Sequence, residues 1–298
     1  MMSTQLSTIL QQIVNALTIG SIYALLAIGF SMVYGVLRLI NFAHGDVFML
    51  GAYFAFLVFQ ALESKFLTGI LLAVVLTGIT GLIIERAAFR PMRGAPEGNL
   101  FISSLAVSML IQNGVIMILG PQPQSFLIPG FLGKSINIGD VVITNIAITI
   151  FVVTIILLII LVLFLTRTKL GISMRATASN LDACHLMGIN VNIAIAVAFG
   201  VSSLIAGVGG ILWATRYTIF NPFTGAVPGI KAFIGALIGG IGSLQGAVIG
   251  GYLLGMLEVL VVILLPPEFA GYRDVFVFLM LIVTLLVRPQ GIMGKTEK

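Results

Sequence analysis

Charged side chains are scarce in this sequence, because Asp, Glu, Lys and Arg together make up only 8% of the chain. A soluble domain carries roughly 25% charged residues, which cover its water-facing surface. Hydrophobic residues reach 59% and form runs of about 20 residues, which is the length of a helix that crosses ~30 Å of hydrocarbon. The runs lack the alternating pattern of a membrane β-barrel. The composition therefore excludes a soluble protein and predicts an all-α, polytopic integral membrane protein.

Reactive and metal-binding residue types are also rare. The single cysteine, Cys184, excludes an internal disulfide. The two histidines, His44 and His185, are far apart in the sequence and have no His or Cys at ligand spacing, so we expect no metal site. No catalytic set of residues stands out, and we expect this chain not to be an enzyme.

A nucleotide-binding loop is missing as well. Residues 133–135 (Gly-Lys-Ser) and 294–296 (Gly-Lys-Thr) resemble the end of a phosphate-binding loop. The glycine that must stand five residues before the Gly-Lys pair is replaced by Ile128 in the first case and by Pro289 in the second. Neither segment can therefore cradle a phosphate. If ATP drives this protein, another chain binds and hydrolyses it.

Basic residues exceed acidic ones and give a net charge of +5, but they are dispersed at the ends of the apolar runs. This pattern sets membrane topology and is not the pattern of a nucleic-acid-binding surface. Arg38, the segments 86–98 and 166–190 and the C-terminal tail hold most of the basic residues, so we place them on the cytoplasmic side. The N-terminus then lies outside. No Lys or Arg precedes the first apolar run, so we expect that run to be retained rather than cleaved as a signal peptide.

Nine apolar segments follow one another along the chain, and two Pro-containing polar segments, 120–140 and 214–229, interrupt them. We expect about eight or nine membrane-spanning helices, the lower number applying if the first or the short seventh segment is re-entrant. The predicted segments are 9–36, 42–62, 66–84, 100–119, 141–165, 191–212, 230–242, 246–265 and 275–287.

The most informative stretch is hydrophilic, because residues 166–190 form a polar island between two apolar spans. The pattern predicts two short helices, one that starts at Gly171 and one that the pair Ser179-Asn180 caps and Gly188 ends. A capped, amphipathic loop is more than a connection between two spans needs, and it indicates a surface that another protein grips. The alternative is a solvated loop that merely retains its helices.

Glycine is abundant, with 34 residues, and it clusters from Gly235 to Gly255 at four-residue spacing. Such faces let helix backbones approach closely in lipid, so the cluster predicts close packing. The alternative is a helix pair that slides during transport. Residues 42–57 weakly echo residues 229–248, and irregular, Gly-interrupted segments at matching places in two halves indicate a transport pathway between repeats.

Polar residues within apolar segments are candidates for lining such a pathway, because burying them in lipid is costly. Asn41, His44 and Asp46 stand where the second segment begins, and Glu258 lies within the eighth. An interfacial helix cap formed by Asn41 or Asp46 is the alternative interpretation of the first group. Gln112 and Asn113 in the fourth segment, like Glu258, are of the kind that hydrogen-bonds to a partner helix.

Residues 15–53 and 171–212 closely resemble the LivH-type permease subunit of high-affinity branched-chain amino acid ABC importers. The resemblance continues through the glycine-rich segment 229–255 and the LVRPQGIMG sequence of the tail, so it covers nearly the whole chain. It implies one transmembrane permease domain over residues 1–298, in the bacterial inner membrane, that helps to import Leu, Ile and Val.

The resemblance also implies partners. These are a LivM-like second permease chain, two cytoplasmic ATPase subunits that hold ATP and Mg²⁺, and a periplasmic amino-acid-binding protein; no cofactor on this chain and no nucleic acid are implied. The polar island would be the coupling loop that docks in an ATPase groove. Its Asp-Ala-Cys and later Gly match the first half of the general importer loop pattern, whereas the Ile-x-Leu-Pro that completes the pattern is absent. The implied coupling residues are Gly171, Arg175, Asp182, Ala183, Cys184 and Gly188.

Other functions fit the residues less closely. The same type of importer could carry urea or short amides, and nothing in the spans separates these cargoes. A stand-alone ion-coupled secondary transporter should show paired ionisable residues at mid-membrane, for which only Glu258 is a candidate. A passive channel or a scaffolding subunit would not need the elaborated polar island.

Overall fold

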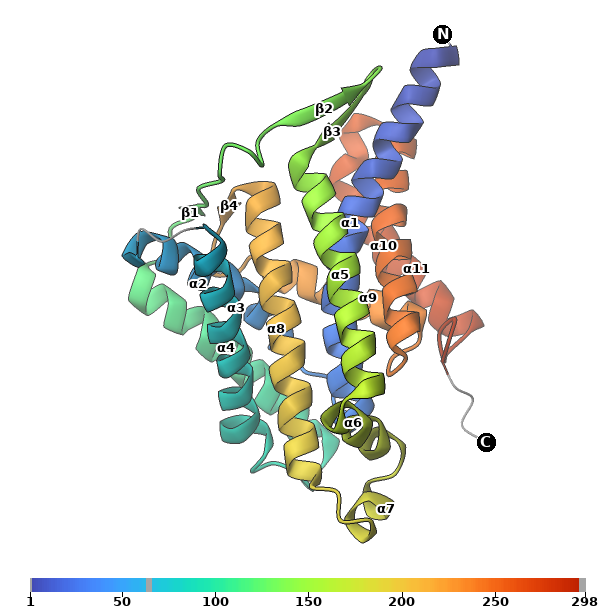
Figure 1. Ribbon diagram of the computed structural model, residues 1–298. Helices are drawn as coiled ribbons and strands as arrows, with labels where there is room; N and C mark the ends of the chain where they lie inside the picture. The colour runs from blue at the N-terminus through green and yellow to red at the C-terminus, as the bar shows by residue number, and fades with distance from the viewer. Residues whose placement is uncertain (1, 63–65, 295–298) are drawn as a thin grey trace.

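The computed structural model of the chain (Figure 1) describes residues 2–62 and 66–294, apart from the side chains of residues 2–5, 62, 97, 182, 267 and 270. Its helices are α1 (Met2–Leu37), α2 (His44–Leu62), α3 (Phe66–Ile84), α4 (Glu97–Leu119), α5 (Asn145–Arg167), α6 (Lys169–Ser179), α7 (Leu181–Leu186), α8 (Val191–Tyr217), α9 (Ala226–Gly239), α10 (Leu244–Leu264) and α11 (Arg273–Val287). The short elements are the π-helical turn η1 (Glu85–Phe89), the 3-10 helical turn η2 (Pro267–Tyr272) and the strands β1 (Gln124–Ser125), β2 (Ser135–Ile138), β3 (Val141–Thr144) and β4 (Ile219–Phe220).

Each of the nine predicted apolar segments contains a helix. Seven of the described helices are long and apolar enough to cross a membrane, whereas α9 and α11 have 14 and 15 residues. Because a helix rises about 1.5 Å per residue, neither of the two spans ~30 Å of hydrocarbon by itself. The predicted number of eight or nine is therefore approximate: seven full-length spans are accompanied by two shorter helices.

The fifth helix begins later than predicted, because residues 141–144 form β3 and pair antiparallel with β2. The run Val-Val-Ile-Thr is β-branched throughout, which favours a strand. The Thr144 hydroxyl then accepts a hydrogen bond from the N–H of Ala147, which caps α5. Strands β1 and β4 pair in the same way, so the polar segment 120–140 is anchored where α8 ends.

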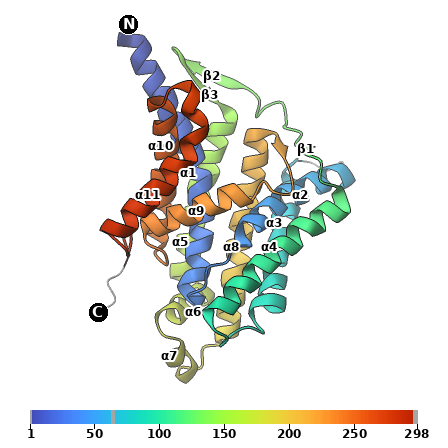
Figure 2. The same cartoon turned by 180° about the vertical axis from the view of Figure 1, so that it is seen from behind.

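Helix α1 lies at the centre of the bundle (Figures 1 and 2), where it packs against α8, α9 and α10. In its most apolar window, 89% of the residues are buried. Helices α4 and α5 lie at the periphery, where only 17% and 22% of the corresponding windows are buried. In a chain that crosses a membrane, these exposed apolar faces contact lipid or partner chains.

The glycine cluster brings helix backbones into direct contact. A Cβ on Gly239 of α9 would lie 1.8 Å from the carbonyl oxygen of Gly246 on α10. A Cβ on Gly251 would lie 2.5 Å from the Cα of Ala24 on α1. The small-residue faces therefore join α9 to α10 and α10 to α1, as the packing interpretation of the sequence expects.

The two ends of the bundle carry different structures. The polar island, with α6 and α7, lies at one end, called the island end below, and the loop between η1 and α4 lies there too (Figure 1). The N-terminus of α1 and the β2–β3 hairpin lie at the opposite end. The basic segments 86–98 and 166–190 are thus at the same end, in agreement with the predicted topology.

Candidate functional site

Helix α2 begins inside the bundle, at a break in the chain that follows α1. Oδ1 of Asn41 accepts a hydrogen bond from the N–H of Ala43 at 3.1 Å, and the Asn41 carbonyl accepts one from the N–H of His44 at 3.1 Å. The N–H of Asp46 donates to the Ala43 carbonyl at 3.0 Å. This turn buries Asn41, His44 and Asp46, which are 4%, 1% and 2% exposed.

A second break, between α8 and α9, repeats this turn. Oδ1 of Asn221 accepts from the N–H of Phe223 at 2.8 Å, and the Asn221 carbonyl accepts from the N–H of Thr224 at 3.0 Å. The N–H of Ala226 donates to the Phe223 carbonyl at 3.1 Å. The same three bonds form at the same spacing, so Asn-Phe-Ala-His-Gly-Asp-Val (41–47) corresponds to Asn-Pro-Phe-Thr-Gly-Ala-Val (221–227).

The two breaks meet at a pair of glycines. A Cβ on Gly45 would lie 2.4 Å from the Gly225 carbonyl oxygen, and a Cβ on Gly225 would lie 1.9 Å from the Gly45 carbonyl oxygen. The chain re-enters the bundle from the island end at the first break and from the opposite end at the second (Figure 2). The starts of α2 and α9 are therefore an inverted pair of chain breaks, although α2 is long enough to cross a membrane and α9 is not. Inverted breaks of this kind place transport sites at the interface of two repeats.

The structural repeat differs from the echo predicted from the sequence. The sequence comparison matched residues 42–57 with 229–248, whereas equivalent hydrogen bonds relate 41–47 to 221–227. The general expectation of two irregular segments at matching places holds, and the hydrogen bonds place the second segment slightly earlier in the chain than the echo in composition. Residues 42–57 and 229–248 are both rich in small residues, which explains their similarity in composition. The equivalent backbone structure, however, is in the turns that begin at Asn41 and Asn221.

A cavity of about 120 Å³ lies between α1, α2, α4 and α9. It is beside the contact of Gly45 with Gly225, which is called the crossing below. Three phenylalanine rings, the Asp46 carboxylate and the polar side chains of Ser108 and Gln112 line the cavity, together with the glycines of the crossing.

Nε2 of Gln112 donates to Oδ1 of Asp46 at 2.8 Å. This bond joins α4 to α2 and gives Gln112 the partner helix that the sequence interpretation expected. Asn113 instead donates to the Met109 carbonyl of its own helix.

The two other polar residues of this group serve the turn rather than the cavity. The Asn41 side chain is occupied by its bond to the Ala43 N–H, as the helix-cap interpretation expects. The His44 ring packs edge-on to Phe30 at 4.8 Å between centroids, and a Cβ on Gly29 would lie 2.2 Å from its Nε2. His44 therefore fills the space beside α1 that the missing side chain of Gly29 leaves.

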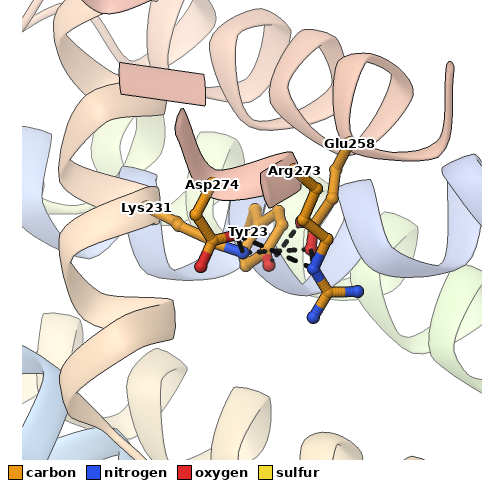
Figure 3. A network of polar contacts seen from close by, with 5 residues as sticks. All are labelled: Tyr23, Lys231, Glu258, Arg273 and Asp274. Carbon is orange, nitrogen blue, oxygen red and sulfur yellow. Dashed lines mark hydrogen bonds and ion pairs between the residues drawn. The ribbon is translucent and has the colours of Figure 1, made fainter. Parts of the chain in front are cut away.

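Glu258 belongs to a separate cluster (Figure 3). Its carboxylate accepts a hydrogen bond from the Tyr23 hydroxyl at 2.8 Å and pairs with Nζ of Lys231 at 3.0 Å and with Nε of Arg273 at 3.3 Å. Lys231 also pairs with Asp274 at 2.6 Å. The cluster joins α1, α9, α10 and α11, so the four candidate pathway residues do not form one site. Sequence reasoning missed the two cations because they stand 27 and 15 residues away from Glu258 in the chain.

The polar island has the two predicted helices, with one changed boundary. The Thr168 hydroxyl accepts from the N–H of Gly171 at 3.0 Å and starts α6, so the helix starts before Gly171. A Cβ at Gly171 would lie 2.3 Å from the Phe164 carbonyl oxygen, and this glycine therefore packs α6 against the end of α5. Oδ1 of Asn180 accepts from the N–H of Ala183 at 2.9 Å, and Gly188, with φ of +72°, follows the end of α7.

The predicted coupling residues divide into exposed and buried positions. Arg175, Ala183 and Gly188 are exposed, whereas Gly171 is buried and Cys184 is only 3% exposed. The side chain of Asp182 lies outside the described residues. Cys184 and Gly171 therefore support the island from within rather than form its outer surface.

Two apolar side chains at the tip of the island escaped the sequence interpretation. Leu186 is 89% exposed and Met187 is 80% exposed, at the end of α7. The signal was present, because two large apolar residues stood next to each other in an otherwise polar segment. An exposed apolar tip on a capped helix is typical of a surface that a partner covers.

Arg93 fastens the neighbouring loop to the helix that leaves the island. Its guanidinium donates to Oδ1 of Asn192 at the start of α8 and pairs with the buried carboxylate of Glu85 in η1. Partial burial lowers the pKa of Arg93, while the carboxylate of Glu85 opposes that shift. The island is therefore supported by α5 on one side and, through α8, by the 85–94 segment on the other.

Comparison with known proteins identifies the family. Residues 12–285 match the family model "Branched-chain amino acid transport system / permease component". The chain is 40% identical to the permease protein BraD of Pseudomonas aeruginosa over 97% of its length and 96% of that protein. It is 39% identical to the permease protein LivH of Escherichia coli and 38% identical to LivH of Salmonella typhimurium, in each case over 99% of both chains.

These relatives are named as permease proteins of high-affinity branched-chain amino acid transport systems. The matches cover the inverted chain breaks, the polar island and the glycine cluster alike. Together with seven span-capable helices in the described part of the chain, they identify a multi-pass inner-membrane protein. The chain belongs to the family of branched-chain amino acid transport system permease components.

Proposed function

We propose that this chain is one membrane half of an ATP-binding cassette importer that moves branched-chain amino acids across the inner membrane. Relatives that match it over nearly their whole length are named as permeases for branched-chain amino acids. A LivM-like chain forms the other membrane half, a periplasmic binding protein delivers the amino acid, and two cytoplasmic ATPases bind ATP and Mg²⁺. The sequence supports the assignment of ATP to partners, because it has no intact phosphate-binding loop.

The polar island is the observation that carries the proposal. Its two helices are capped by Thr168 and Asn180 and rest on α5 and α8, so the island transmits a push as a stiff unit. Leu186 and Met187 project from its tip, with the right chemistry to enter an apolar groove of an ATPase. Closure of two ATPases around ATP would then tilt the attached helices as rigid bodies.

The experiment replaces the apolar tip. In the complex purified with its partner subunits, Leu186→Ser together with Met187→Ser should at least halve the amount of ATPase that co-purifies and should abolish uptake. Leu127→Ser is the control, because Leu127 is 86% exposed and belongs to the segment between β1 and β2, far in the chain from the polar island. Unchanged ATPase recovery and unchanged uptake in the double variant would remove the island from the docking surface.

A stand-alone ion-coupled carrier is supported less well. Such a carrier needs an ionisable group at mid-membrane that gains and loses a cation during the cycle. Glu258, the residue that suggested it, is already paired with Lys231 and Arg273. Vesicles that contain this chain alone should therefore accumulate no leucine against a gradient, and accumulation without nucleotide or partner chains would favour the carrier.

A further inference from the structure

Asp46 differs from the other buried carboxylates of the described residues. Glu85 pairs with Arg93, and Glu258 pairs with Lys231. Asp46 is 2% exposed, accepts a hydrogen bond from the Gln112 amide, and forms no ion pair within the described part of the chain. A buried carboxylate without a cation is costly unless something else supplies the positive charge.

The surroundings of Asp46 fit a small cation. Phe30, Phe42 and Phe233 line the same cavity, and the Phe233 ring lies 5.7 Å from the Phe30 ring and 5.8 Å from the Phe42 ring, between centroids. The faces of aromatic rings carry partial negative charge and attract ammonium groups. A carboxylate combined with several aromatic rings therefore recognises an ammonium group and repels an anion.

We propose that this cavity is a subsite for the primary ammonium group of the transported amino acid, with Asp46 as its counter-charge. The inference rests on the proposed function for the nature of the cargo, but the preference for a cation rests on the cavity alone. Gln112 and Ser108 hold the Asp46 carboxylate from α4 by hydrogen bonds, and no positive charge of the described residues pairs with it, so its charge is available to the ammonium group. The apolar rings beside it accept the first carbons of the cargo.

The inverted repeat makes the subsite one-sided. The residue equivalent to Asp46 in the second turn is Ala226, and both residues line the cavity. One of the two helix tips carries the charge, and the other offers only backbone and a methyl group. The two positions face the same space from opposite tips, so a carboxylate transferred to residue 226 should serve the same ammonium group.

The first test measures the charge preference of the cavity without using the cargo. Ser108→Cys, in a Cys184→Ala background, places a thiol in the cavity wall of the assembled membrane complex. We expect cationic aminoethyl methanethiosulfonate to modify it at least tenfold faster than the anionic sulfonatoethyl reagent. Adding Asp46→Asn should bring the two rates within threefold of each other, whereas Asp46→Glu should preserve the preference. Equal rates with Asp46 intact would overturn the proposal.

The second test measures transport. In proteoliposomes with the complete complex, Asp46→Asn should lower leucine uptake per assembled complex at least tenfold, and Ala226→Asp added to Asp46→Asn should restore at least a third of it. A role of Asp46 in holding α4 would not be rescued from the opposite tip, so loss without any recovery contradicts the proposal, as does unchanged uptake in Asp46→Asn. Absence of leucine uptake by the unaltered complex would instead refute the proposed cargo and leave the thiol test standing.

Discussion

Two buried carboxylates of this molecule are held in opposite ways. Glu258 accepts a hydrogen bond from Tyr23 and lies within 3.3 Å of cationic nitrogens of Lys231 and Arg273 (Figure 3). Asp46 accepts hydrogen bonds from the Gln112 amide and the Ser108 hydroxyl and, among the described residues, has no cation. Both side chains belong to residues that are less than 5% exposed, at 4% and 2%. Burial alone therefore does not distinguish them, but their partners do.

This difference in partners distinguishes a cluster that stabilises the bundle from a site that can bind a ligand. The Glu258 cluster satisfies its own charges and joins four helices, so it fixes their positions. Asp46 faces a cavity and contacts α4, one of the least buried helices. The Glu258 cluster, whose charges are paired, contributes rigidity. The Asp46 carboxylate, which has no cation and lies beside a cavity, contributes affinity for a cation.

The largest effect on stability should come from breaking the paired cluster. Lys231→Met leaves the buried Glu258 carboxylate with the Tyr23 hydrogen bond and with the half-exposed Arg273 as its one remaining ion-pair partner among the described residues. Removing one member of a buried ion pair costs about 3 kcal/mol or more. Thermal unfolding of the purified complex should show a loss of that order, and Lys231→Met combined with Glu258→Met should recover most of it. Equal stability of the single and double variants would mean that the cluster contributes no mutual stabilisation.

The next largest loss of stability should come from a larger residue where the starts of α2 and α9 meet. In Gly225→Ala, the new Cβ would meet the Gly45 carbonyl oxygen at 1.9 Å, and neither backbone can move without shifting its helix. Overpacking of this kind costs ~1–3 kcal/mol. Gly114→Ala is the matched control, because a Cβ there meets no atom within 4 Å and α4 should gain up to about 1 kcal/mol of helix propensity. Equal melting temperatures of Gly225→Ala and Gly114→Ala would contradict the close contact of the two backbones at Gly225.

Asp46→Asn should change stability by less than about 1 kcal/mol, in contrast to Lys231→Met. The neutral amide keeps the shape of Asp46, and its oxygen still accepts the Gln112 hydrogen bond, while an unpaired buried charge is removed. The same unfolding experiment, run beside the uptake assay, checks the contrast. A loss of several kcal/mol in the free energy of unfolding would show that Asp46 has a structural role like that of Glu258.

The smallest effect on stability should be at the surface of the polar island. Arg175→Glu changes an exposed side chain and should alter the free energy of unfolding by no more than about 0.5 kcal/mol. The same change should lower the rate of cargo-stimulated ATP hydrolysis in the complex, because it reverses a charge on the proposed docking surface. Normal stimulation would restrict docking to the apolar tip.

Local signals in the sequence predicted the elements well and the contacts between them poorly. The caps and stops of the island follow from Asn180 and Gly188, whose bonds reach three residues or fewer. The spans are apolar on all sides, so their sequence does not indicate which face meets which neighbour. The bond of Gln112 to Asp46 joins residues 66 positions apart, and that of Tyr23 to Glu258 joins residues 235 apart. Such pairs depend on the packing of whole helices.

The inverted turns show a subtler limit. Asn41 and Asn221 start the same hydrogen-bonded turn, but the residues that follow them share only glycine and valine. A comparison by composition passes over so short a match and favours longer glycine-rich stretches. The backbone hydrogen bonds identify the repeat, because they record the shape that the two short sequences have in common.

The contact between Gly45 and Gly225 leaves no side chain between the two tips. Backbones that already touch act as a mechanical stop, since they cannot be pressed closer together. A stroke delivered from the island can therefore only shear the tips past each other or pull them apart. The contact therefore sets the shortest distance between the two tips, and a relative movement of α2 and α9 at this point must slide or separate them.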